Sequence, residues 1–254
     1  MRAAPAFLMH LLYPPKCRGC GVRFDIFRQP QPLPLCPNCL EPWAKAKAAR
    51  CAICGSAVSE CDCMPPLLRE AGCAALVKAV AYHPNQKELP ERLILRCKSV
   101  RDRELFAFFA ADVQLPLWQA LARVGGEQNA VVTYIPRRRR AVAEEGVDQG
   151  YELARALGRS LELPVVKTLQ NKGKTAQKTL DHAERQAQAD TAIRLRKTTT
   201  DAVRGKTVVL VDDITTAGAT LAAATRQLLD AGAAQVICCV VGVTANAAGG
   251  KEIP

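Results

Sequence analysis

The residue types best suited to chemistry gather in one short segment of this 254-residue sequence, residues 208–220. Four apolar residues are followed by two adjacent carboxylates, Asp212 and Asp213. The segment then ends in small and hydroxyl residues, which are Thr215, Thr216, Ala217, Gly218, Ala219 and Thr220. Because parallel sheets bind ligands just beyond the carboxyl ends of their strands, the two carboxylates are predicted to project into a binding site.

The small and hydroxyl residues predict a phosphate-binding loop that opens a helix. Free backbone N–H groups and the positive end of a helix bind anions, and the threonine hydroxyls add further donors. Two carboxylates directly before such a loop would repel a phosphate unless they face something else. Ribose hydroxyls, or a Mg²⁺ ion bridging to them, meet that requirement. The segment therefore predicts a site for a ribose phosphate.

Other interpretations of this segment lack their required residues. A P-loop needs Gly-Lys-Ser/Thr, and a dinucleotide-binding fingerprint needs three spaced glycines after the first strand. A phosphatase-type nucleophile needs two aspartates separated by one residue, whereas these two are adjacent. The alternative without a function is a strand that ends in two solvated carboxylates before a capping threonine.

Eight of the twelve cysteines form four close pairs near the start of the chain. They are Cys17, Cys20, Cys36, Cys39, Cys51, Cys54, Cys61 and Cys63. The first four follow the C-x2-C-x15-C-x2-C spacing of a zinc ribbon, and the second four are less regular. Two residues between thiolates let a tight turn direct both sulfurs at one ion. Buried or redox-active thiols are the alternative. We expect structural Zn²⁺ sites with no open coordination position and hence no chemistry of their own.

The elements that must position these residues read as strands alternating with helices. Apolar runs predict strands at 130–135, 165–166, 207–211 and 236–243, and periodic patterns predict helices at 147–161 and 218–231. This order favours an α/β fold with an open parallel sheet. Residues 1–65 form the expected double zinc-ribbon domain, 66–243 the α/β domain and 244–254 a frayed tail. The polar stretch 170–190 is predicted to be a mobile loop.

Composition and charge restrict the class of protein. A mean hydropathy of −0.02 and 49% hydrophobic residues indicate a soluble globular chain. No uninterrupted apolar stretch has the length of a membrane span, and the apolar start lacks a signal-peptide cleavage site, so we expect a cytoplasmic protein. The net charge of +11 favours polyanionic partners. Aromatic residues make up 5%, which argues against a long platform for stacking bases.

Residues 208–220 resemble the phosphoribosyl-pyrophosphate (PRPP) signature of type I phosphoribosyltransferases. The resemblance implies that Asp212 and Asp213 hold the ribose hydroxyls and act as the catalytic pair, with Mg²⁺ bound alongside PRPP. It also implies that the loop from Thr215 to Thr220 surrounds the 5′-phosphate. In that family the loop after the first strand binds pyrophosphate, and here that loop carries Arg137 and Arg138.

The cysteine pairs placed ahead of this signature resemble the ComF family, which is associated with natural competence and the handling of incoming single-stranded DNA. The resemblance covers nearly the full length of the chain. Family members usually carry Arg-Gly-Phe-Asn-Gln after the basic loop, whereas residues 145–149 here read Glu-Gly-Val-Asp-Gln. A carboxylate thus stands where an arginine would meet phosphate or DNA.

The resemblance leaves two main functions open. The first is a competence factor that binds nucleic acid, such as single-stranded DNA, or the uptake machinery, with PRPP or a nucleotide as effector. The second is an active phosphoribosyltransferase that joins phosphoribose to a nitrogenous acceptor. His10, His83 and His182 are isolated in the sequence, which leaves Asp213 as the one obvious candidate for a general base. A ribbon-mediated interaction scaffold is the third and simplest alternative.

Overall fold

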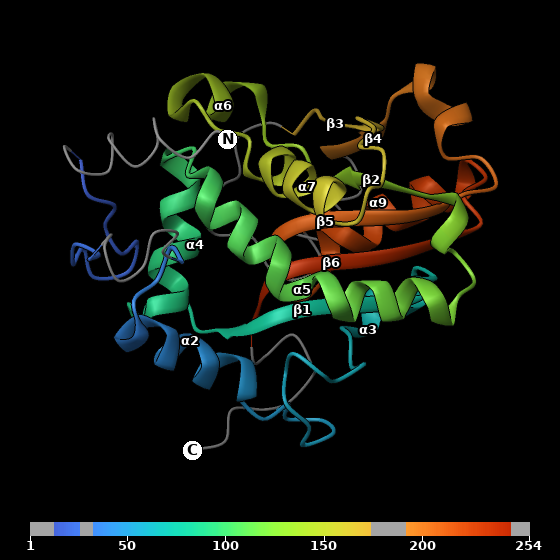
Figure 1. The fold of residues 1–254 in the computed structure, drawn as a ribbon. Coiled ribbons are helices and arrows are strands. Elements are labelled where there is room, and N and C mark those ends of the chain that lie inside the picture. Colours follow the sequence, from blue (N-terminus) through green and yellow to red (C-terminus); the bar gives the residue numbers. More distant parts are fainter. Residues whose placement is uncertain (1–12, 26–32, 174–191, 245–254) are drawn as a thin grey trace.

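A four-stranded parallel sheet forms the centre of the computed structural model, which describes residues 13–25, 33–173 and 192–244 (Figure 1). The strands are β1 (Ala75–Tyr82), β2 (Ala130–Tyr134), β5 (Thr207–Thr215) and β6 (Gln235–Thr244). Their order in the sheet is β1-β6-β5-β2, and each neighbouring pair is parallel. The predicted α/β fold with an open parallel sheet is confirmed. Because β5 lies between two neighbours, the segment that carries the carboxylates starts from the interior of the sheet.

Helices cover both faces of this sheet (Figure 1). They are α2 (Pro37–Ala48), α3 (Pro66–Glu70), α4 (Leu89–Ser99), α5 (Arg103–Arg123), α7 (Gln149–Ser160) and α9 (Ala219–Asp230). A further helix, α6 (Arg139–Glu145), has no buried residue and lies outside this packing. Short 3₁₀ turns cover Glu127–Asn129 and Lys197–Ala202. Alternate residues of β5 serve the two layers: Val209 and Val211 pack with α4, α5 and α7, and Val208 and Leu210 pack with α3 and α9.

Most of the predicted elements are present, with three differences. The predicted strand at 165–166 is reduced to a single parallel bridge between Val165 and Val132. The ends of the predicted loop pair as an antiparallel hairpin, β3 (Leu169–Asn171) with β4 (Ile193–Leu195). The strand β1 was not predicted, because Lys78 interrupts its apolar run. Residues 174–190 of the predicted loop, 245–254 of the predicted tail and the apolar start before Tyr13 lie outside the described residues.

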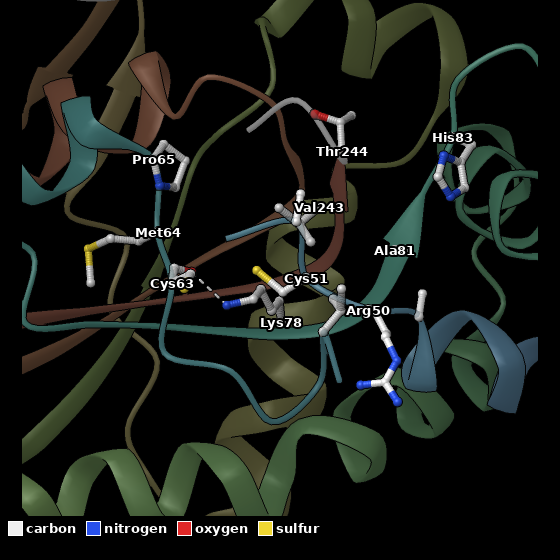
Figure 2. Close-up of a pocket in the computed structure, with 13 residues that line it drawn as sticks. Arg50, Cys51, Cys63, Met64, Pro65, Lys78, Ala81, His83, Val243 and Thr244 are labelled. Carbon is white, nitrogen blue, oxygen red and sulfur yellow. Dashed lines mark hydrogen bonds between the residues drawn. The ribbon is translucent and has the colours of Figure 1, made fainter. Parts of the chain in front are cut away.

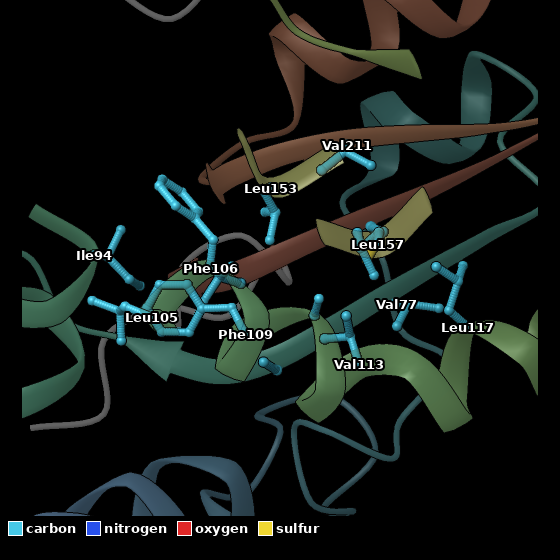
Figure 3. Close-up of a cluster of buried hydrophobic side chains, with 14 of the residues drawn as sticks. Val77, Ile94, Leu105, Phe106, Phe109, Val113, Leu117, Leu153, Leu157 and Val211 are labelled. Atoms are coloured by element: carbon cyan, nitrogen blue, oxygen red, sulfur yellow. The ribbon is translucent and has the colours of Figure 1, made fainter. Parts of the chain in front are cut away.

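Helix α5 is a core helix with an unusual composition. It is long and apolar enough to cross a membrane by length and composition alone, with a hydropathy of 1.3 in its best window. In the structure its inner side chains, which include Phe106, Phe109, Val113 and Leu117, lie against the sheet and α7 (Figure 3). Burial in this layer accounts for the apolar composition of the helix.

The cysteine-rich segment packs against the α/β domain through one side chain in particular. Trp43 of α2 is 2% exposed and stacks on Phe109 of α5, with ring centroids 5.4 Å apart. Its indole Nε1 donates to Asp112 of α5 at 3.0 Å. Residues of the first cysteine set belong to the same hydrophobic core as the sheet. The ribbon segment and the α/β domain thus bury apolar surface together.

Candidate functional site

The two carboxylates lie at the carboxyl end of β5, where the strand extends past its neighbour β2. The last residue of β2, Tyr134, pairs with Val211, so Asp212 and Asp213 lie beyond the end of β2. Each carboxylate accepts a backbone N–H from the next residue, Asp212 from Asp213 at 2.9 Å and Asp213 from Ile214 at 2.8 Å. The predicted position of the acidic pair at the strand end is therefore what the structure shows.

The environment of the two carboxylates differs. Burial and the neighbouring Asp213 charge raise the pKa of Asp212 well above its usual value. Asp213 instead accepts a hydrogen bond from Nε2 of Gln149 at 2.5 Å and lies 3.9 Å from the ammonium of Lys98. One carboxyl is thus favoured in its protonated form, while the other has a donor and a cation beside it.

Gln149 has one atom that is not used within the described residues. The side chain is 7% exposed, and its Oε1 is buried without a hydrogen-bond partner in that part of the chain. A buried acceptor without a donor is costly, which makes this oxygen a ready partner for a ligand hydroxyl or N–H group. Lys98 and Gln149 were not predicted as site residues, since a lysine in the last turn of α4 and a glutamine at the start of α7 have no chemical pattern of their own.

The predicted phosphate loop is a tight turn into α9. Gly218 is the N-cap residue with φ +80°, a left-handed conformation that glycine adopts without strain. No side chain caps this end of α9 among the described residues, so the N–H groups of its first turn are available as donors. Thr215 is buried as the last residue of β5, whereas Thr216 is exposed and Ala217, Ala219 and Thr220 are half-buried around the turn.

The basic loop after β2 contains two arginines in different situations. The guanidinium of Arg137 donates twice to the Glu145 carboxylate, at 2.9 Å each, and also to the carbonyl oxygens of Lys98 and Val147 at 3.2 and 3.3 Å. Arg138 is half-buried, and no ion pair joins it to a carboxylate within the described residues. Arg137 thus joins the end of α4 to the end of α6, and Arg138 is the arginine of this pair with its charge uncompensated.

Both predicted metal sets come together in space. In each set, four sulfur atoms lie within 4.8 Å of one another, which suits tetrahedral Zn²⁺ with its Zn–S distance of about 2.3 Å. The two sets fold alike: in each, a glycine at positive φ follows the second cysteine and donates its N–H to the carbonyl of the first, as Gly21 does to Cys17 and Gly55 to Cys51. The residues present fit two structural zinc ions.

A buried lysine attaches the second set to the sheet. The ammonium of Lys78, in β1, donates to the carbonyl oxygens of Cys61 and Cys63 at 2.6 and 2.7 Å (Figure 2). A pocket of about 190 Å³ lies beside it, between this cysteine set and the ends of β1 and β6. The lysine that interrupts the apolar run of β1 is therefore a structural link to the second ribbon.

Comparisons with known proteins find a matching domain family and a relative similar over most of the chain. Residues 141–253 match the model of the phosphoribosyl transferase domain family. Over 207 residues the chain is 25% identical to competence protein ComFC of Bacillus subtilis (strain 168), which covers 79% of this chain and 80% of that relative. The chain is thus similar to a ComF protein over most of its length. The resemblance based on the cysteine pairs and the strand-end signature is confirmed.

Two solved structures also align with part of this chain. An adenine phosphoribosyltransferase aligns with a TM-score of 0.38 and 19% identity, over 56% of this chain and 72% of that chain. The allosteric regulatory enzyme of purine biosynthesis aligns with a TM-score of 0.36 and 18% identity, over 58% of this chain and 30% of that one. The chain thus spans less than a third of the latter enzyme. The family match of the ComF-like chain includes β5 and α9, and it begins after Arg137 and Arg138.

Proposed function

We propose that this ComF-like protein is a cytoplasmic competence factor that handles single-stranded DNA in natural transformation and binds PRPP at the carboxyl end of β5. The observation that supports the PRPP site is the juxtaposition of Asp212 and Asp213 with the uncapped start of α9, at the position where parallel sheets bind ligands. The order of cysteine sets and transferase domain supports the ComF-like role.

Each part of the strand-end site has a task in this proposal. Asp212 and Asp213 face the ribose hydroxyls, and the turn from Thr215 to Thr220 receives the 5′-phosphate. Arg138 meets the pyrophosphate directly, and Arg137 keeps the loop in place through its bonds to Glu145 and the two carbonyl groups. Mg²⁺ would be held together with PRPP near the acidic pair and would offset the charge of the pyrophosphate.

A phosphoribosyltransferase activity is the second candidate, and the asymmetry of the two carboxyl groups favours it. Asp212, whose raised pKa favours its protonated form, lies beside Asp213, which accepts a hydrogen bond from Gln149 and has the ammonium of Lys98 near it, so the two carboxyl groups are suited to different tasks in proton transfer. Such a pair could exchange a proton with a nitrogenous acceptor while Arg138 of the basic loop stabilises the departing pyrophosphate.

Calorimetric titration of the zinc-loaded protein with PRPP and Mg²⁺ tests the proposal. We expect saturable binding that is lost in the Asp212→Asn, Asp213→Asn variant. The matched control, Asp201→Asn, Asp230→Asn, removes two exposed carboxylates elsewhere and should bind like the wild type. Absence of binding to the folded wild-type protein would refute the PRPP site. Release of pyrophosphate on addition of a purine, pyrimidine or amine acceptor would establish the transferase.

A further inference from the structure

The hairpin β3–β4 buries apolar side chains and also carries a basic groove. Leu169 and Ile193 point inward and are 1% exposed each. The hairpin, which Figure 1 shows at the edge of the molecule, also carries a groove of about 450 Å³. The groove is lined by Gln170, Lys172, Arg194, Leu195, Arg196 and Thr198. We call these six residues the hairpin groove. It contains three cations and no acidic residue.

The three cations of the hairpin groove lack compensating charges within the described residues. No ion pair joins Lys172, Arg194 or Arg196 to a carboxylate in that part of the chain. In the neighbouring basic loop Arg137 pairs with Glu145 and Arg140 with Glu144, whereas no ion pair joins Arg138 to a carboxylate within the described residues. The hairpin cations and Arg138 together therefore form a region of unpaired positive charge that favours an anionic partner.

The backbone spaces these cations in a row. Arg194 is on β4 and Arg196 directly follows its last residue, so the two are two residues apart, which corresponds to about 6.7 Å along an extended backbone. Backbone pairing continues past the strand ends, from the N–H of Lys172 to the carbonyl of Ala192 at 2.7 Å and from that of Arg196 to Thr168 at 2.8 Å. This spacing suits successive phosphates of a strand stretched to about twice the 3.4 Å spacing of B-form DNA.

The row of cations continues toward the strand-end site. The side chain of Asn171 donates to the carbonyl of Pro136 at 3.1 Å, which fastens the hairpin to the basic loop. A Cβ atom at Gly173 would lie 3.7 Å from Nε of Arg138, so that arginine borders the end of the hairpin. A chain of phosphates on the groove could thus extend to the loop that is proposed to bind pyrophosphate.

We propose that the hairpin groove binds the phosphate backbone of single-stranded nucleic acid. This inference rests on the proposed handling of single-stranded DNA and gives it a location. Arginine forks match phosphate oxygens, and the groove has no aromatic side chain among its six residues for base stacking. Binding through the backbone is therefore expected to be salt-dependent and tolerant of sequence. An acidic protein or an anionic membrane is the competing partner that the test must separate.

Fluorescence anisotropy with a labelled oligodeoxythymidylate and the full-length, zinc-loaded protein tests this location. The test variant is Lys172→Gln, Arg194→Gln, Arg196→Gln. The matched control, Arg69→Gln, Arg103→Gln, Arg159→Gln, removes the same charge from exposed positions on other elements. Three lost phosphate contacts should make the slope of log K against log[salt] shallower by about 2, which is roughly a hundredfold weaker binding at ~0.1 M salt. The control should keep the wild-type slope.

Three results would overturn the inference. The first is that the wild type does not bind the oligonucleotide, and the second is that both triple variants lose oligonucleotide binding equally. The third is that the test variant loses binding to poly-glutamate or to phosphatidylserine vesicles while its oligonucleotide binding is unchanged. The Asp212→Asn, Asp213→Asn variant should bind the oligonucleotide like the wild type. Failure of the PRPP site and failure of the hairpin groove therefore give different results.

Discussion

Arg137 provides the sharpest test of how the basic loop works, because sequence and geometry assign it different tasks. The resemblance implies a phosphate ligand, whereas in the structure its guanidinium is bonded to Glu145, Lys98 and Val147. The substitution Arg137→Gln removes these bonds and leaves the carbonyl oxygens of Lys98 and Val147 without their donor. We expect a loss of stability that exceeds any effect of removing one positive charge.

The size of the expected loss in the free energy of unfolding follows from the groups that Arg137 contacts. The Glu145 carboxylate is 39% exposed, so solvent screening limits the ion pair to about 1 kcal/mol despite its two bonds. Each bond to a carbonyl oxygen adds roughly 0.5 kcal/mol at these longer distances. Arg137→Gln is therefore expected to lower the free energy of unfolding by about 2 kcal/mol. Arg138→Gln is the neighbouring control and should change it by less than ~0.5 kcal/mol.

Urea unfolding of the zinc-loaded protein, followed by tryptophan fluorescence, measures these differences as midpoint shifts at constant slope. The effect should also depend on pH. Arg137 lowers the pKa of Glu145, so the pair contributes stability above the ordinary glutamate pKa and loses it as pH falls through the lowered one. The gap between wild type and Arg137→Gln should narrow below about pH 4.5.

The refuting result combines stability with ligand binding. If Arg137→Gln unfolds like the wild type but weakens PRPP binding more than tenfold, Arg137 is a phosphate ligand and its bonds to Glu145 are incidental. In that case a double-mutant cycle that combines Arg137→Gln with Glu145→Gln gives a coupling energy near zero. Our interpretation requires a coupling of about 1 kcal/mol.

Three further predictions concern other parts of the chain. Because burial raises the pKa of Asp212, the free energy of unfolding falls as pH rises above the ordinary aspartate pKa. Asp212→Asn should therefore raise the free energy of unfolding at pH 7, and urea titrations should show that this gain fades toward pH 4. Removing zinc with a chelator should release two ions per chain in native mass spectrometry and cost several kcal/mol of stability. Lys78→Met should leave the carbonyl groups of Cys61 and Cys63 without a hydrogen-bond donor and lower the free energy of unfolding by about 2 kcal/mol. It should also weaken the second zinc site, which is measured as faster zinc transfer to a chromogenic chelator.

The features that could be predicted from the sequence are those whose parts are adjacent in the chain. Strand, acidic pair, turn and helix follow one another within residues 207–230, so local patterns identify both the site and its position in a parallel sheet. The cysteine sets are equally local, since a pair spaced by two residues already determines a turn. In both cases the chemistry and the backbone geometry depend on the same few residues.

The features that could not be predicted depend on contacts between distant residues. Gln149, which donates to Asp213, is 64 positions away from it in the sequence. Lys98, which lies near the same carboxylate, is on α4 and is still farther away in the sequence. The four arginines of residues 137–140 look alike in the sequence, yet Arg137 and Arg140 are ion-paired. The bonds of Arg137 to the Glu145 carboxylate occupy its guanidinium, a contact that the run of four arginines does not reveal.

Helix α4 connects the two predicted sites, which look independent in the sequence. Arg18, within the first cysteine pair, bonds Asp102 at 2.7 Å, and Arg96 near the end of α4 lies 3.5 Å from the same carboxylate. The last turn of α4 then places Lys98 beside Asp213. These ion pairs connect the first cysteine set, through Asp102 and the end of α4, to the lysine beside Asp213, although these parts lie far apart in the sequence.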